Sequence, residues 1–330
     1  MVKITQVVRQ KILLCMLIVL CVLSGCSSTH GITKKIFSEL LVASKSKSEL
    51  LAINTSSGQL VGTFNPGSRV NQILFSNNKL VAYLLLANKP VIEVINPYSL
   101  TIDGAIKLPG VPKFMAVSPQ KNSIYGYVLI KHSPDLAVVN LANYKTVSSY
   151  YVGQDPSSVT ILSSGLIALV TDYLNNSLNV VDLVRKEIKE RIAVCQNPTN
   201  VSYRLDSLVA YVGCDGSDQI QPVNLIKFNA QPAILVNQGI SQMLVDRLNL
   251  RDYIVKQGSN LVSVLNLING SLETPITLNA NTYCVAISSD DSRLFVSEEN
   301  TKRVLILSTT FEKPVGYFQL GIDPGCLSSN

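Results

Sequence analysis

Residues 178–188, "LNVVDLVRKEI", form a strand followed by a turn, and the return of this pattern along the chain decides the fold. "LAVVNLANYKT" begins at Leu136, and "LVSVLNLINGS" begins at Leu261. A polar residue closes each copy of the strand: Asn54, Asn96, Asn140, Asp182, Asn224, Asn266 and Ser308, spaced by 42, 44, 42, 42, 42 and 42 residues. Such regular spacing indicates seven copies of one unit. We attribute the longer step to "VLIKHSPDL", which has two additional residues.

Each unit contains four expected strands. "MAVSPQKNSIYGYVLI" and the following "LAVVNLANYKTVSSYYVGQDP" alternate apolar, β-branched runs with Asn, Ser, Gly and Pro. No stretch after residue 38 has a sustained helical period. A four-stranded repeat of roughly 40 to 50 residues is typical of a propeller blade, because neighbouring blades cover both of its faces. We therefore predict an all-β fold: one seven-bladed β-propeller of four-stranded antiparallel blades over residues 38–330.

The two ends of this region predict how the ring closes. "SELLVASKSKSELLAINTSSGQLVGTF", from Ser38, supplies the second, third and fourth strands of a blade but not the first. "LGIDPGCLSSN", at the carboxyl end, aligns with "VGQDPSSVTILSS" and supplies a surplus first strand. We expect this last strand to join the amino-terminal blade, which would leave no sheet edge unpaired at the seam.

The units also resemble a known family. "CVAISSDDSRLFVSEENTKRVLILSTTFEKPVGYFQLGIDP" is similar to the YVTN repeats of bacterial and archaeal surface β-propellers, which are quinoprotein-like in fold. Residues 211–214, "YVGC", and 295–298, "FVSE", occupy the YVTN position. The similarity is best over 114–200 and 282–324 and weak over 215–250. It implies the propeller fold and little about activity, since propellers carry many unrelated functions.

The amino end predicts export. Lys3, Arg9 and Lys11 accompany an apolar run over residues 12–23 that is too short to span a bilayer. The following "LSGC", ending at Cys26, resembles the lipobox of bacterial lipoproteins. That resemblance implies that residues 1–25 are a signal peptide, and that Cys26 receives a diacylglycerol and an acylated amino group, with palmitate as a typical acyl chain. The alternative is an ordinary signal peptide in which Cys26 has no such role.

Several acyl chains on one residue give stable anchoring. We therefore expect residues 26–37 to be a lipidated tether that holds the protein at a bacterial membrane, in the periplasm. Ser27 replaces the aspartate that retains many enterobacterial lipoproteins in the inner membrane. In a Gram-negative cell this residue favours the outer membrane.

Charge and composition exclude several functions. Without the three bases of the signal, 25 Lys and Arg face 22 Asp and Glu, which leaves about +3 and disfavours nucleic-acid binding. The chain has no Trp, and His132 is the one histidine of the predicted propeller. A histidine-rich metal site or an axial histidine pair for haem is therefore not expected. We predict no cofactor and no metal, and we assign no catalytic residue.

Four cysteines lie in the predicted propeller. Cys284 and Cys326 each follow a repeat marker by 18 residues, which places them on neighbouring first strands at the seam. In an exported protein this favours a Cys284–Cys326 disulfide, with Cys195–Cys214 as the second pairing. The alternative is four buried free thiols that act as small hydrophobic residues.

The same offset of 18 collects one residue from each first strand: Gln72, Phe114, Ser158, Asn200, Gln242, Cys284 and Cys326. First strands line the central channel of a propeller, so we expect this ring near one mouth. The loops around Gln154, Asp155, Asn197 and Asp323 should surround that mouth, and we take both sets as the candidate ligand or partner face. The alternative is that these polar residues only solvate a water-filled channel.

These features favour a binding or scaffolding module for another envelope component, either a protein or a glycan. One alternative is an envelope enzyme, a lyase or hydrolase of glycans, that uses residues of the channel mouth. A second alternative is nucleic-acid binding, by analogy with some YVTN-type periplasmic proteins, and the weak mature charge argues against it.

Overall fold

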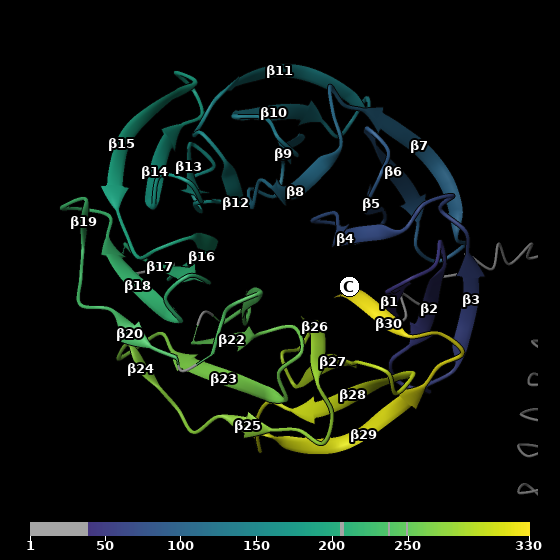
Figure 1. The fold of residues 1–330 in the computed structure, drawn as a ribbon. Helices are drawn as coiled ribbons and strands as arrows, with labels where there is room; N and C mark the ends of the chain where they lie inside the picture. The colour runs from purple at the N-terminus through teal and green to yellow at the C-terminus, as the bar shows by residue number, and fades with distance from the viewer. Residues whose placement is uncertain (1–38, 205–207, 237, 249) are drawn as a thin grey trace, which may run out of the picture. The chain divides into compact units, whose positions relative to one another are not determined.

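The computed structural model describes residues 39–330, except 205–207, 237 and 249. Seven antiparallel sheets surround a central axis, so the predicted seven-bladed β-propeller is confirmed (Figure 1). No helix with the length and hydropathy to cross a membrane occurs among these residues. The predicted signal peptide (1–25), the lipidation site Cys26 and the tether (26–37) lie outside the described residues.

Four blades consist of four consecutive strands, with the first at the channel and the fourth at the rim. Blade 2 contains β4 (Val70–Phe75), β5 (Ala82–Leu86), β6 (Val91–Asn96) and β7 (Thr101–Lys107). Blade 3 contains β8 (Pro112–Val117), β9 (Tyr125–Ile130), β10 (Asp135–Asn140) and β11 (Lys145–Tyr151). Blade 4 contains β12 (Pro156–Ile161), β13 (Ile167–Asp172), β14 (Ser177–Asp182) and β15 (Glu187–Ala193). Blade 7 contains β26 (Thr282–Ile287), β27 (Arg293–Glu298), β28 (Arg303–Ser308) and β29 (Lys313–Gln319).

Blades 5 and 6 have a divided fourth strand. Blade 5 contains β16 (Pro198–Arg204), β17 (Val209–Cys214), β18 (Gln219–Asn224), β19 (Asn229–Ala230) and β20 (Ile234–Leu235). Blade 6 contains β21 (Gln242–Val245), β22 (Arg251–Val255), β23 (Leu261–Asn266), β24 (Ser271–Leu272) and β25 (Ile276–Thr277). Pro232 and Pro275 lie in the two gaps. Because proline has no N–H to donate, it interrupts the ladder there, at the rim where such a break is tolerated.

Blade 1 closes the ring with strands from both ends of the chain. It contains β30 (Pro324–Ser329), β1 (Glu39–Ser44), β2 (Leu50–Asn54) and β3 (Leu60–Phe64). β30 pairs antiparallel with β1, with Leu40 opposite Ser329 and Val42 opposite Leu327. The expected closure by the last strand is therefore confirmed.

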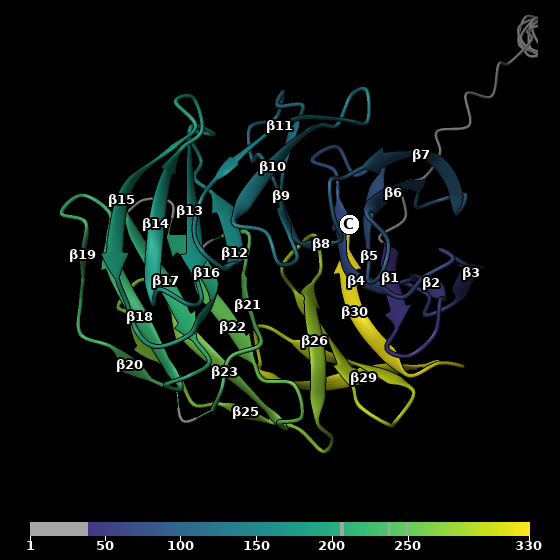
Figure 2. The ribbon, with the colours of Figure 1, turned by 45° about the horizontal axis from the view of Figure 1, so that its top comes forward.

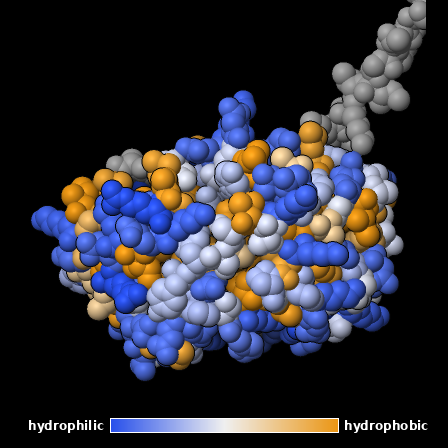
Figure 3. Space-filling view, turned by 90° about the horizontal axis from the view of Figure 1, so that it is seen from above, coloured by the Kyte–Doolittle hydropathy of each residue, from blue (hydrophilic) through white to orange (hydrophobic). Residues whose placement is uncertain are grey.

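Turns and loops lie on two opposite faces of the disc, which Figure 2 shows obliquely. We call "turn face" the face with the turns from first to second and from third to fourth strands. The "loop face" carries the connections from second to third strands and from the fourth strand to the next blade. The rim between them mixes hydrophilic and hydrophobic residues (Figure 3).

The repeating polar residue has a local structural cause. In six blades the side-chain oxygen of the Asn or Asp accepts two backbone N–H groups of the following turn, as Asn140 does from Ala142 and Asn143. In blade 7 the hydroxyl of Ser308 accepts the N–H of Phe311 at 3.3 Å. Such side chains stabilise turns by replacing a backbone acceptor, so this position returns in every unit.

The additional two residues of blade 3 lie in a different turn from the one predicted. Phe75 pairs with Ala82 in blade 2, whereas the equivalent Val117 pairs with Gly126 in blade 3. The insertion is therefore in the first-to-second-strand turn, "SPQKNSIY", and not in "VLIKHSPDL". A solvent-exposed turn accommodates it because the paired strands keep their register.

Seven hydrophobic clusters hold the blades together, one at each interface between neighbours. The cluster at the seam joins Leu40 and Val42 of blade 1 to Phe295 and Val304 of blade 7. Each large side chain buried in this way contributes about 1.5–3 kcal/mol. The core is thus a ring of sheet-on-sheet contacts, which leaves the axis itself open.

Six of the seven first strands contain a bulge near their start. In β4 the pairing passes from Val70 to Gln72, so Asn71 has no partner on β5. In β8 it passes from Pro112 to Phe114 in the same way. A bulge re-aims the side chains beside it. This device determines which residues reach the channel.

Candidate functional site

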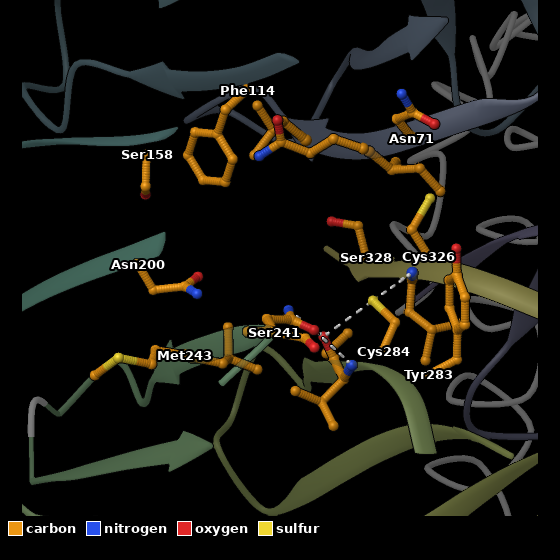
Figure 4. Close-up of a pocket in the computed structure, with 18 of the residues that line it drawn as sticks. Asn71, Phe114, Ser158, Asn200, Ser241, Met243, Tyr283, Cys284, Cys326 and Ser328 are labelled. Carbon is orange, nitrogen blue, oxygen red and sulfur yellow. Dashed lines mark hydrogen bonds between the residues drawn. The ribbon is translucent and has the colours of Figure 1, made fainter. Parts of the chain in front are cut away.

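A cavity of about 460 Å³ occupies the centre of the ring (Figure 4). All seven residues of the predicted ring line it: Gln72, Phe114, Ser158, Asn200, Gln242, Cys284 and Cys326. They come from seven different first strands, as the common offset predicts. Their roles nevertheless differ, because some of them bond to the neighbouring blade.

Gln72 and Gln242 connect blades. The amide of Gln72 donates to the carbonyl of Met115 at 3.2 Å and accepts the N–H of Met115 at 2.8 Å. Gln242 makes the same pair of bonds to Val285, both at 2.9 Å. Each amide therefore satisfies a donor and an acceptor of the next first strand, which uses one of its two N–H groups and one of the two lone pairs of its oxygen.

Cys284 and Cys326 are free thiols, so the predicted disulfide between them is wrong. The sulfur of Cys284 accepts the N–H of Leu327 at 3.3 Å, and the sulfur of Cys326 donates to the carbonyl of Val70 at 3.4 Å. Equivalent side chains on successive first strands point in the same direction around the ring, each toward the next blade. Cys284 therefore points toward the strand of Cys326, while Cys326 points onward to blade 2.

The thiols of Cys284 and Cys326 are not suited to nucleophilic chemistry. Burial raises the pKa of Cys284 to about 11 and that of Cys326 well above its usual value. Both groups therefore remain protonated at neutral pH, whereas the thiolate is the form that reacts as a nucleophile. Burial likewise raises the pKa of Tyr283, which lines the cavity beside them.

The cavity surface combines one aromatic ring with small polar groups. Phe114 projects into the space, and Ser158 and Asn200 lie along the same side of it (Figure 4). The amide nitrogen of Asn200 donates to the hydroxyl of Thr199 at 3.1 Å, which uses one of its two N–H groups. Ser241 and Ser328 add hydroxyls from the opposite wall.

Several lining residues are not expected from the sequence pattern. Asn71, Lys113 and Tyr283 lie one residue before a ring position, and strict strand alternation assigns them to the other side. The bulges bring them in, because two residues of a bulged strand face one residue of its partner. The proline at the start of several first strands, such as Pro112, is the one local signal for this irregularity.

The charged groups of the lining are cationic and paired. Lys113 forms a 2.8 Å ion pair with Asp155, and Arg247 lies 4.0 Å from Asp291. None of the described residues that line the cavity is an aspartate or a glutamate. The cavity therefore offers neutral hydrogen-bonding groups, with neither a pair of carboxylates nor a basic stripe.

The four predicted loop residues, Gln154, Asp155, Asn197 and Asp323, do not line the cavity. Instead they shape the loop face around it. The buried carboxylate of Asp172 accepts the N–H of Gln154 at 2.8 Å and that of Asp155 at 3.0 Å. The N–H of Asn197 donates to the side chain of Asn176 at 2.8 Å. These loops are thus fixed in place by hydrogen bonds to the adjoining turns.

Cys195 and Cys214 form a disulfide, as the second predicted pairing has it. It joins the loop after β15 to the end of β17, so it links blade 4 to blade 5 at the loop face. No group of three or more His, Cys, Asp or Glu side chains with metal-binding geometry occurs in the part of the chain that the structure describes.

The fold and the channel together define the class: the protein is a seven-bladed β-propeller. No protein-family model matches its sequence, and no curated protein matches it either. Among solved structures it is similar to a functionally unknown protein from Desulfotomaculum acetoxidans, with a TM-score of 0.76, 12% identity, and coverage of 88% of this chain and 98% of that one.

Two further solved structures share the fold. The periplasmic gluconolactonase of Pseudomonas aeruginosa matches with a TM-score of 0.72 and 11% identity over 89% of this chain and 99% of that one. The hydrazine synthase of Kuenenia stuttgartiensis matches with a TM-score of 0.68 and 15% identity over 78% of this chain and 89% of that one. At such identities the likeness shows the propeller fold alone.

Proposed function

We propose that the protein is a lipid-anchored propeller of the bacterial envelope, built of YVTN-type repeats, that binds a neutral glycan of another envelope component in its central channel. The observation that carries this proposal is the lining itself. It presents amides, hydroxyls and aromatic rings, and its described residues include no acid. Binding pockets combine apolar and aromatic walls with a few polar groups that orient the ligand.

The individual groups fit an uncharged, hydroxyl-rich ligand. Asn71 and Asn200 can each donate and accept hydrogen bonds, and Ser158 and Ser241 add hydroxyls that do both. The ring of Phe114 offers a flat apolar surface against which the C–H face of a sugar can pack (Figure 4). An ionic ligand has less to gain, because Lys113 and Arg247 already have acidic neighbours.

Binding of neutral oligosaccharides, such as N-acetylglucosamine and glucose oligomers, tests the proposal by isothermal titration calorimetry. We expect saturable binding by the wild type and a loss of about tenfold or more for Phe114→Ala, which corresponds to about 1.4 kcal/mol. Phe311→Ala is the control, because Phe311 is an exposed residue of the turn face. Equal affinity of Phe114→Ala and wild type, or no binding of any neutral glycan, would reject the channel as this site.

The anchor is tested separately. The motif ending at Cys26 supports lipidation, and mass spectrometry of the mature amino-terminal peptide measures it directly. We expect a diacylglyceryl, N-acylated Cys26, and fractionation into the outer membrane of a Gram-negative host. An unmodified amino terminus would reject the anchor and leave the channel proposal intact.

Catalysis on glycans is the second candidate, because one structural neighbour is named as a gluconolactonase. A glycoside hydrolase of the usual kind needs two carboxylates that flank the scissile glycosidic bond, and the described lining residues supply none. Nucleic-acid binding is less favoured still, since both cations of the lining are paired. Turnover of a bound glycan, or salt-sensitive retention of single-stranded DNA, would reverse this order.

A further inference from the structure

Large apolar side chains are exposed at repeated positions of the turn face. An inner row lies just before the second strand in blades 2 to 6: Leu80, Ile124, Leu166, Leu208 and Leu250, each with 41–53% of its surface exposed to solvent. An outer row lies in the third-to-fourth-strand turns of blades 4 to 7: Val184, Ile226, Ile268 and Phe311, at 65–70% exposure. We call the two rows together the apolar crown.

The crown belongs to one face of the disc. Among the loop-face connections that the structure describes, Leu174 is the one large apolar residue with an exposed side chain. The rim in Figure 3 mixes hydrophilic and hydrophobic residues. Polar residues normally occupy such hairpin turns. Apolar residues at equivalent positions of several units form an extended surface of the kind that contacts a partner or a membrane.

Exposed bases accompany the crown. Lys121, Arg185, Lys186, Lys227 and Arg247 are exposed in the turns of this face. Its exposed acids include Glu187, which lies 3.9 Å from Arg185, and Asp290. Apolar side chains together with Lys and Arg are the combination that binds the interfacial region of anionic bilayers.

The described chain also begins at this face. Glu39, the first residue of β1, is hydrogen-bonded to Asn330, which follows β30 at its turn-face end. Cys26 precedes Glu39 by 13 residues, which span at most about 45 Å when extended. A lipid on Cys26 would therefore tether the propeller through the turn-face end of β1.

We propose that the apolar crown lies on the surface of an anionic lipid bilayer, with Leu, Ile, Val and Phe side chains in the interfacial region and the bases at the headgroups. The orientation rests on the lipid anchor of the proposed function, whereas the crown rests on its own exposure and charge. The disc then lies flat, and the loop face with its fixed loops points away from the membrane, open to an envelope ligand.

Depth-dependent fluorescence quenching tests this arrangement in the full lipidated protein, bound to vesicles of phosphatidylethanolamine and phosphatidylglycerol that contain brominated lipid. An environment-sensitive fluorophore is attached at Val184→Cys or, as the matched control, at Leu174→Cys. Both residues are exposed in turns of blade 4, on opposite faces. We expect at least about threefold stronger quenching at position 184, measured above the background of labelled wild type.

A second measurement uses charge. With the fluorophore at Leu166→Cys, the triple variant Val184→Asp, Ile226→Asp, Ile268→Asp should lower quenching at least about fivefold, because carboxylates resist entry to an anionic interface. The control triple Leu174→Asp, Leu235→Asp, Val315→Asp changes three residues outside the crown that are also well exposed, at 56–58%, and should leave quenching unchanged. Thermal unfolding of each variant shows that the ring is intact.

The outcomes separate the two proposals, since mass spectrometry of the same preparation reports acylation of Cys26. Acylated protein with equal quenching at positions 184 and 174 overturns the crown and keeps the anchor. Unacylated protein with preferential quenching at 184 keeps the crown and overturns the anchor. Quenching that is unaltered by the crown triple, or capture of the crown by a second copy of the chain in crosslinking, also overturns the membrane assignment.

Discussion

The backbone N–H of Glu39 donates to the side-chain oxygen of Asn330 at 2.8 Å, and the N–H of Asn330 donates to the carbonyl of Glu39 at 3.1 Å. Both residues are buried. The side-chain nitrogen of Asn330 also donates to the hydroxyl of Tyr98 in blade 2 at 3.2 Å. Asn330 thus joins the two strands that close blade 1 and connects them to the neighbouring blade 2.

Asn330→Ala should lower the free energy of unfolding by about 1–3 kcal/mol, because it leaves the buried N–H of Glu39 without this acceptor. Removal of residues 324–330 deletes β30 and should prevent a soluble, cooperative fold. Urea unfolding measures the first change and size-exclusion chromatography the second. Wild-type stability in Asn330→Ala would show that β30 pairing alone holds the seam.

Reduction of the Cys195–Cys214 disulfide should lower stability by about 3 kcal/mol. The bond closes a loop of about 20 residues, so it restricts the unfolded chain. The double variant Cys195→Ala, Cys214→Ala should match the reduced protein and become insensitive to reductant. Equal thermal midpoints with and without reductant would contradict the prediction. The double variant Cys284→Ala, Cys326→Ala serves as control, since those thiols are free.

Gln242→Leu should cost about 2–3 kcal/mol, because the N–H and carbonyl of Val285 both lose their hydrogen-bond partner within the core of the ring. Gln242→Glu should cost less, since its carboxylate still accepts the N–H of Val285. The control is Gln59→Leu, an exposed glutamine of the turn in blade 1. Chemical denaturation measures the unfolding free energy of the three variants. A Gln242→Leu protein as stable as Gln59→Leu would show that the two hydrogen bonds between Gln242 and Val285 do not stabilise the ring.

Asp252 should make the protein less stable as pH rises. Burial raises its pKa from 3.8 to about 7, while the hydroxyl of Ser202 donates to it at 2.5 Å. Between pH 4 and 7 the folded protein therefore holds a proton that the unfolded chain has released, so the free energy of unfolding falls across this window and levels off above it. Below pH 4 both states are protonated and the effect of this residue vanishes.

Asp252→Asn removes the titration. The difference in unfolding free energy between this variant and wild type should shift by about 2 kcal/mol or more in favour of the variant from pH 4 to pH 8. The comparison cancels every other titrating group. Parallel curves of unfolding free energy against pH for the two proteins would show that the pKa of Asp252 is not raised by folding.

Some features of the fold could be read from the chain because they are local and periodic. The markers from Asn54 to Ser308 hold turns within their own hairpins, so their spacing counts blades without knowledge of distant contacts. The missing strand before Ser38 and the surplus strand after Asp323 follow from the same count. Even the ring of residues at the channel follows, because the offset from each marker is constant.

Other features depend on the neighbouring blade. Gln72 and Asn200 hold equivalent positions, yet the first bonds to Met115 while the second bonds to Thr199 beside it. Cys284 and Cys326 are equivalent too, and the common direction of equivalent side chains keeps them from forming the disulfide that their spacing suggested. Bulges add Asn71 and its counterparts to the lining against the period of two.

The sequence by itself therefore determined the number of blades, their four-stranded composition and the closure, because a strand-and-turn unit carries its own local signals. Only the tertiary structure decided which polar residues connect blades, which face the cavity, and that the exposed apolar residues gather on one face. Those outcomes depend on the rotation that relates one blade to the next, and the partner of a side chain then lies about 43 residues away, as Met115 does from Gln72.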